Sequence, residues 1–149
     1  MDNFVFAMEK SYNYMLEEIN EILDGTIYSD NERKRLFYAC GSCLHLILDF
    51  AERIDISEKD REYISAFRFA NNALKHDKDL FDFTEETGGI SFPITFPLVI
   101  PKKEVRWKKL ENNGKFESQY NNYVKYLEKQ PVLETHKKVI AVLLNYIAE

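Results

Sequence analysis

Apolar residues recur at three- and four-residue spacing over long stretches of the chain, which places them on one face of a helix. The first stretch runs from Asp2 to Asp24 and is followed by Gly25, a residue type that commonly ends helices. The second begins with the S-x-x-E sequence from Ser29 to Glu32, which can satisfy unpaired backbone N–H groups, and continues to about Ile54. The third runs from Ser57 to about His76. The expected core-facing residues of the first two helices are Phe6, Tyr12, Met15, Leu16, Ile19, Ile22, Leu23, Leu36, Cys40, Cys43, Leu44, Ile47 and Phe50.

The pattern changes between about residues 84 and 110. Pro93, Pro97 and Pro101 exclude a long helix, while the apolar residues from Ile90 to Ile100 occupy every second position, as they do in a strand. We expect this run to form a strand or extended arm, with Val105 to Lys108 as the second strand of a hairpin. Because proline has no N–H to donate, it restricts such strands to the edge of a sheet.

Helical spacing returns near Phe116, breaks at Pro131 and continues from Val139 to Ile147. Together these patterns predict a mainly α fold, an up-and-down bundle of four to five helices with a short β-hairpin or extended insertion around residues 84–110. The chain has 149 residues, which suits a single helical domain covering residues 1–149.

Composition narrows the class of protein. The N-terminus lacks a basic leader followed by a long apolar segment, and no apolar run is long enough to span a bilayer, so we expect neither export nor membrane insertion. Cys40 and Cys43 lie within an apolar helical pattern, with His45 nearby. A single cysteine pair lacks the second pair of ligands found in zinc sites, so we interpret both as buried core cysteines of a cytoplasmic protein without metal or cofactor, with a metal or redox role as the alternative.

Charge is distributed unevenly along the chain. The net charge of -5 argues against a surface built entirely for nucleic acid. The segment from Lys102 to Lys115 nevertheless carries six basic residues and only two acidic ones, Glu104 and Glu111. This segment is either a solvated loop or a patch that faces phosphates. Its basic residues are Lys102, Lys103, Arg106, Lys108, Lys109 and Lys115.

The third helix is expected to have two apolar faces. Stepping about 100° per residue gives a core stripe of Tyr63, Ile64, Phe67, Ala70, Asn71 and Leu74, with Ser65, Phe69, Asn72 and His76 on nearly the opposite side. Phe69 has no place in the core stripe, so a second buried surface is expected, either a dimer contact or the floor of the β insertion. His76 lies near Arg68 and Lys75, where it could hold a phosphate and exchange a proton. Alternatively, His76 only complements the helix dipole while Asn72 bonds nearby backbone.

The string Asn71-Asn72-Ala73-Leu74-Lys75-His76, late in a bundle helix, resembles the R-N-x-x-x-H signature of HEPN domains. The resemblance implies a helical module of the kind common in bacterial toxin–antitoxin, phage-defence and RNA-processing systems. Such modules often dimerise so that two copies of the motif face each other, and the active ones resemble metal-independent ribonucleases in which the His and the Arg act at the scissile phosphate. By position, His76 corresponds to the motif His and Asn72 to the motif Asn.

The motif Arg falls on Asn71, which departs from the pattern. An Asn side chain is neutral and short, so it cannot offer the bidentate charged fork that stabilises a phosphate in its transition state. Either Arg68 substitutes from the adjacent face, or the chain keeps the scaffold without the cleavage. Loss of one charged transition-state contact typically costs about a hundredfold or more in rate, which favours the second alternative.

The leading hypothesis is therefore a HEPN-like homodimer that associates with RNA or with a protein partner of a defence or toxin–antitoxin system and has weak or absent ribonuclease activity. The alternatives are a non-enzymatic protein–protein interaction domain and a metal-independent endoribonuclease using His76 with Arg68. The candidate catalytic residues are His76, Asn72 and Arg68; the candidate binding residues are Asn71, Lys75, Lys102, Lys103, Arg106, Lys108 and Lys109; and the candidate dimer or partner face is Ser65 with Phe69.

Aromatic residues are frequent in the second half of the chain. Trp107 and three tyrosines of the fourth helix are interpreted as bundle core, with stacking on bases or on a partner as the alternative. These tyrosines are Tyr120, Tyr123 and Tyr126. His136 lies beside two lysines in the last helix, so we expect it at the surface.

Overall fold

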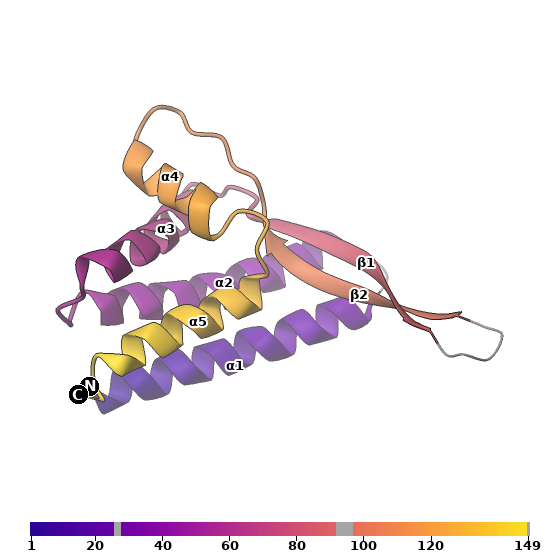
Figure 1. Ribbon diagram of the computed structural model, residues 1–149, viewed down its shortest axis with the longest axis horizontal. Coiled ribbons are helices and arrows are strands. Elements are labelled where there is room, and N and C mark those ends of the chain that lie inside the picture. The colour runs from indigo at the N-terminus through magenta and orange to yellow at the C-terminus, as the bar shows by residue number, and fades with distance from the viewer. Residues whose placement is uncertain (26–27, 92–96, 149) are drawn as a thin grey trace.

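Five helices and one antiparallel hairpin make up the described part of the computed structural model, which covers residues 1–25, 28–91 and 97–148 (Figure 1). The mainly helical class predicted from the sequence is confirmed, as is the insertion of a hairpin between the third and fourth helices. Within the described residues, no helix is both long and apolar enough to cross a membrane. The elements in chain order are α1 (Asp2–Asp24), α2 (Asp30–Ala51), α3 (Glu58–Lys75), β1 (Phe81–Ser91), β2 (Pro97–Trp107), α4 (Glu117–Tyr126) and α5 (Val132–Asn145).

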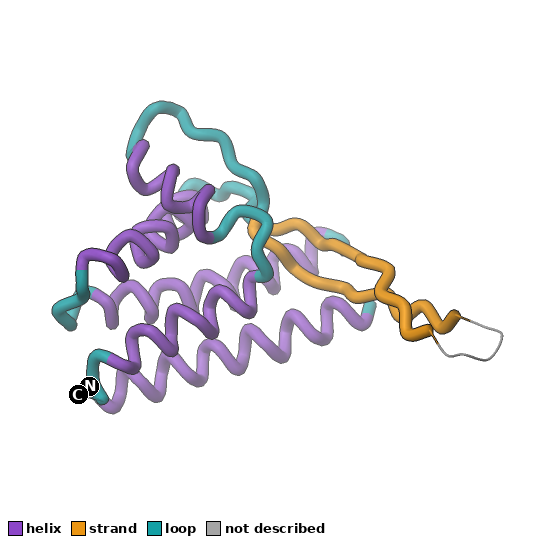
Figure 2. The backbone as a smooth tube through the Cα atoms, viewed as in Figure 1, coloured by secondary structure: helices purple, strands orange, loops and turns teal. Residues whose placement is uncertain are grey.

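The helices form two connected groups. Helices α1, α2 and α5 contact one another along their lengths, while α3 packs on α2 and carries α4 on its outer side (Figures 1 and 2).

The predicted core residues of α2 are all buried, including both cysteines. On α1, the periodicity placed Phe6 in the core, but Phe6 is 62% exposed and Met8 is buried instead. Burial raises the pKa of the Cys43 thiol to about 11 and that of the Cys40 thiol well above its usual range, so the interpretation as core cysteines is confirmed.

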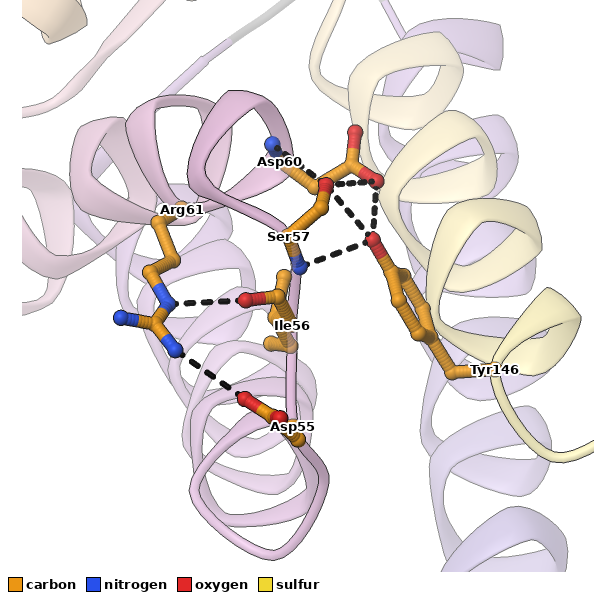
Figure 3. Close-up of polar contacts among 6 residues, drawn as sticks. All are labelled: Asp55, Ile56, Ser57, Asp60, Arg61 and Tyr146. Carbon is orange, nitrogen blue, oxygen red and sulfur yellow. Dashed lines mark hydrogen bonds and ion pairs between the residues drawn. The ribbon is translucent and has the colours of Figure 1, made fainter.

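Two of the helix starts are fixed by the side chains that the sequence indicated. The Glu32 carboxylate accepts a hydrogen bond from the Ser29 N–H at 2.9 Å, which completes the capping box of α2. At the start of α3, the Ser57 hydroxyl accepts from the Asp60 N–H. Figure 3 shows how the end of α5 joins this cap: the Tyr146 hydroxyl donates to the Asp60 carboxylate at 2.5 Å and accepts from the Ser57 N–H at 3.1 Å. The last helix is thus tied to the first turn of α3.

The hairpin pairs Phe81 with Trp107 at its base and Ser91 with Pro97 at the last described pair. Its base lies among the helices, and the strands then project past them (Figure 1). The alternating run that we expected to form one strand is divided, because β1 ends at Ser91 and β2 begins at Pro97. Residues 92–96 lie outside the described residues.

The base of the hairpin contributes the largest buried side chain of the core. Trp107 is fully buried, and its indole N–H donates to the Thr135 hydroxyl at 2.8 Å. Its ring stacks on that of His136, with centroids 5.5 Å apart. His136 is therefore buried rather than at the surface, and its Nδ1 lies 2.8 Å from the Val132 carbonyl oxygen while Nε2 faces the Cys40 sulfur at 3.9 Å. The prediction for His136 was wrong because the tryptophan that covers it comes from a distant part of the sequence.

The burial of His136 makes stability depend on pH. Burial lowers the pKa of His136 from 6.5 to about 4, against the opposing effect of its hydrogen bond to Val132. Between these pH values the unfolded chain binds a proton at this residue that the folded protein does not, so acid favours unfolding. We expect this residue's contribution to the free energy of unfolding to fall by about 3 kcal/mol as pH drops from above 6.5 to about 4.

Urea denaturation at a series of pH values measures this effect, with His136→Gln as the control because its amide does not titrate. Carboxylates titrate in both proteins, so the relevant quantity is the difference between the two curves. A wild-type curve parallel to that of the variant between pH 4 and pH 6.5 would contradict the assignment.

Candidate functional site

A pocket of about 910 Å³ lies between the end of α3 and the loop of residues 108–116, and we call it the His76 pocket. It brings together two segments that the sequence singled out separately, the pair Asn72 and His76 and the basic residues Lys108 and Lys109. The lining residues are Phe69, Asn72, Ala73, His76, Lys78, Asp79, Lys108, Lys109, Leu110, Glu111, Asn112, Asn113, Lys115 and Phe116.

One wall of this pocket is the turn that ends α3. The N–H of Asp77 bonds to the Leu74 carbonyl and the N–H of Lys78 bonds to the Ala73 carbonyl, while Asp77 itself has a φ of 54°. This is the hydrogen-bond pattern of a Schellman motif, with Asp77 in the left-handed position that glycine usually takes. The turn leaves His76 exposed at the end of the helix and directs the chain on to Asp79.

The opposite wall is held by backbone and ionic contacts of Lys108. Its N–H donates to the Leu80 carbonyl at 2.7 Å, and its carbonyl accepts from the Tyr123 hydroxyl at 2.5 Å. Its ammonium group pairs with Asp79 at 3.0 Å, and Arg33 of α2 reaches the same carboxylate at 3.1 Å. Partial burial raises the pKa of Asp79, but the Lys108 ammonium, the Phe81 N–H and Arg33 outweigh it and lower the pKa below its usual value. Asp79 thus stays ionised and fastens the two walls to each other.

The pocket has a surplus of positive charge. Four lysines line it, Lys78, Lys108, Lys109 and Lys115, against the carboxylates of Asp79 and Glu111. The first of these carboxylates is already paired with Lys108 and Arg33. Together with the imidazole of His76 and the amide of Asn72, the pocket offers several hydrogen-bond donors to an anion and few competing charges.

Arg68 lies in a different pocket. This second pocket of about 300 Å³, which we call the Arg68 pocket, is lined by His45, Leu48, Asp49, Glu52, Arg68, Asn71, Asn72, Lys75, Phe116 and Gln119. The Arg68 guanidinium pairs there with Glu52 at 2.9 Å. Arg68 and His76 therefore line neighbouring pockets rather than one, and Asn72 is the only candidate catalytic residue among the described lining of both.

The other two α3 candidates of the Arg68 pocket are Asn71 and Lys75. Asn71 was expected in the core stripe, but it is only partly buried, and its Oδ1 atom is buried without a hydrogen-bond partner among the described residues. Lys75 is exposed. The remaining residues of the predicted core stripe, Tyr63, Ile64, Phe67, Ala70 and Leu74, are buried.

The proposed dimer or partner face of α3 is covered by the chain's own α4. Phe69 is 8% exposed and lies against Tyr120 and Tyr123, with ring centroids 5.4 and 5.3 Å apart. Ser65 accepts a hydrogen bond from the Asn122 side chain at 3.2 Å. The second buried surface predicted from Phe69 therefore exists, but neither a partner nor the hairpin is needed to bury it.

The basic run from Lys102 to Lys115 does not form one patch. Lys103 reaches the Gly25 carbonyl at 3.4 Å, and Arg106 pairs with Glu104 at 2.6 Å and donates to the Lys129 carbonyl. The side chain of Lys102 lies outside the described part of the structure. Within this run, Lys108, Lys109 and Lys115 line the His76 pocket, while Trp107, which directly precedes Lys108, is buried in the core.

Phe116 is the site residue that the sequence did not indicate. It precedes α4 with a left-handed backbone (φ 54°, ψ 44°), follows Gly114 at φ 88°, and leaves its ring 57% exposed. It lines both pockets. A bulky residue is uncommon in this conformation, which costs roughly 1–3 kcal/mol. The only sequence signal was the turn sequence Asn113-Gly114 before it, which marks a reversal of the chain but not its backbone angles.

Comparison of the chain with protein-family models, with curated proteins and with solved structures finds no match. The HEPN resemblance thus rests on the motif residues of α3 alone. Among the described residues, no three His, Cys, Asp or Glu side chains are close enough together to hold a metal ion.

The left-handed backbone of Phe116 predicts an unusual order of stabilities. Glycine has no Cβ and tolerates a positive φ, so Phe116→Gly is expected to be more stable than Phe116→Ala by about 1 kcal/mol in urea denaturation. The matched pair is Lys115→Gly and Lys115→Ala, since Lys115 is also exposed but does not have a positive φ. There the alanine variant is expected to be at least as stable. A Phe116→Gly protein less stable than Phe116→Ala would show that the backbone is not left-handed.

Proposed function

We propose that this chain is a HEPN-like module that binds the phosphates of RNA in the His76 pocket and does not cleave the RNA. One observation carries the proposal: the pocket of about 910 Å³ joins His76 and Asn72 of the motif helix to Lys108, Lys109 and Lys115 of a loop more than thirty residues later. The resemblance implies a role at phosphate for the first group, and a phosphate-facing patch was one of the two alternatives for the second.

The chemistry of the lining suits an RNA backbone. Ammonium groups attract phosphate at long range, and the His76 imidazole and the Asn72 amide can donate hydrogen bonds at close range. Lys109 and Lys115 are exposed, so they can reach a ligand without breaking contacts in the core. Lys108 is held by Asp79 and supplies a fixed positive charge at the wall of the pocket.

The absence of cleavage in this proposal follows from the position of Arg68, the arginine nearest to the motif in the sequence. Cleavage in the family that the motif resembles uses a His and an Arg at one phosphate. Here Asn71 takes the place of the motif Arg, while Arg68 lines the neighbouring pocket and pairs with Glu52. Lysine offers a point charge rather than a planar fork, so the lysines of the His76 pocket favour binding over transition-state stabilisation.

The resemblance also implies a homodimer. Because α4 covers Ser65 and Phe69, a dimer would have to form through another face of the molecule. The mass of the protein in solution tests this part of the proposal separately from RNA binding.

Neutralising two exposed lysines of the loop, Lys109 and Lys115, should weaken RNA binding in a salt-dependent way. Each phosphate contact to single-stranded nucleic acid contributes about 0.7 to the slope of log affinity against log salt. The double variant Lys109→Gln with Lys115→Gln is therefore expected to reduce that slope by up to about 1.4. Fluorescence anisotropy of a labelled RNA oligonucleotide over a series of salt concentrations measures it. The control is Lys137→Gln, which changes an exposed lysine of α5 outside both pockets.

If the slope of log affinity against log salt is unchanged in the double variant, RNA does not bind in the His76 pocket. Wild-type protein that binds no RNA at low salt would instead favour the protein–protein interaction alternative. The same protein incubated with RNA in metal-free buffer should leave it intact. Cleavage that disappears in His76→Ala would show that the module is a ribonuclease and would overturn the non-cleaving part of the proposal.

A further inference from the structure

Phe116 presents an aromatic ring to solvent at a place where the chain does not need one. Its ring is 57% exposed, and it stands in a strained left-handed backbone that a glycine would adopt at lower cost. Phe6, which is 62% exposed, lies on α1 and lines neither pocket. Stability alone therefore gives no reason for an aromatic side chain at this position.

The ring stands where the two pockets meet. Phe116 and Asn72 are the residues that line both. On one side the His76 pocket contributes Lys109 and Lys115, and on the other the Arg68 pocket contributes Lys75. Lysines thus flank the exposed ring on both sides. The surplus of positive charge lies in the His76 pocket, because Asp49 and Glu52 balance Arg68 and Lys75 in the Arg68 pocket.

This arrangement matches the way proteins bind single-stranded nucleic acid. Such proteins stack unpaired bases on aromatic rings while lysines and arginines follow the backbone. In a duplex the faces of the bases are covered by their neighbours in the stack, so an isolated ring at the surface has no base face to bind. A ring that stacks on a base in this way would therefore favour an unpaired strand over a duplex.

We infer that Phe116 is a stacking platform for an unpaired base of RNA, with the phosphate next to that base in the His76 pocket. This inference rests on the proposed function and narrows its substrate to single-stranded RNA.

The test compares the affinities of Phe116 variants for short labelled single strands of oligoadenosine and for the same strand in a duplex. Removal of one stacking contact corresponds to a loss of roughly 5- to 150-fold in affinity. We expect Phe116→Ala to show such a loss for the single strand, with an unchanged salt slope because no charge is removed. Phe116→Trp is expected to restore the affinity, and the wild-type protein is expected to bind the duplex more weakly than the single strand.

The matched control is Phe6→Ala, which removes an equally exposed ring outside the pockets and is expected to bind as the wild type does. Thermal unfolding, monitored by circular dichroism, verifies that each variant is folded. If Phe116→Ala does not fold, the affinity of the Phe116→Trp protein for the single strand provides the test. Wild-type affinity in a folded Phe116→Ala protein, no recovery in Phe116→Trp, or equal affinity for the duplex would each overturn the inference.

These outcomes separate the inference from the proposed function. If Phe116→Ala binds RNA normally while the Lys109 and Lys115 double variant loses affinity, Phe116 is not a stacking platform, but the proposal of a phosphate site in the His76 pocket is supported. If the wild-type protein binds no RNA, both are wrong.

Discussion

The burial of Trp107 positions the rest of the site. Its ring contacts Phe67 of α3, Phe81 at the start of the hairpin, Tyr123 of α4 and His136 of α5, and its indole N–H donates to Thr135. Its backbone also pairs with residues 129 and 130 in the turn between α4 and α5. Four elements distant in the sequence therefore meet at one side chain. Because Lys108 directly follows Trp107, this contact also fixes where the loop of residues 108–116 leaves the core.

The His76 pocket results from two chain reversals that face each other. On one side the Schellman turn ends α3 and exposes His76, and on the other the loop begins at the anchored Lys108. The Asp79 carboxylate lies between the two reversals. Its ion pair with Lys108 connects the two walls of the pocket, and Arg33 of α2 pairs with the same carboxylate. Among the described pocket residues, the exposed lysines Lys78, Lys109 and Lys115 take no part in these ion pairs. Lys108 thus has a structural role, and the proposed contacts to phosphate fall to its exposed neighbours.

The local sequence pattern predicted the helices and the hairpin, but it did not predict which residues pack against one another in space. The starts of α2 and α3 follow from Ser29 and Ser57, whose caps depend only on residues three positions away. His136 was misplaced because its burial depends on Trp107, and the covering of Phe69 depends on α4, neither of which is encoded near the residue concerned. Phe116 was missed because sequence spacing carries no information on a left-handed backbone at a residue that is not glycine. His76 and the loop lysines were each indicated by the sequence, and only their meeting in one pocket required the fold.

Amide hydrogen exchange with and without a short single-stranded RNA tests most directly the claim that the turn after α3 and the loop of residues 108–116 form one RNA site. We expect RNA to slow amide exchange in two separate segments, residues 75–79 and residues 108–117. Amide exchange in the described part of the hairpin and on the exposed face of α1 is expected to stay unchanged. Slower exchange confined to β1 and β2, or in only one of the two segments, would contradict it.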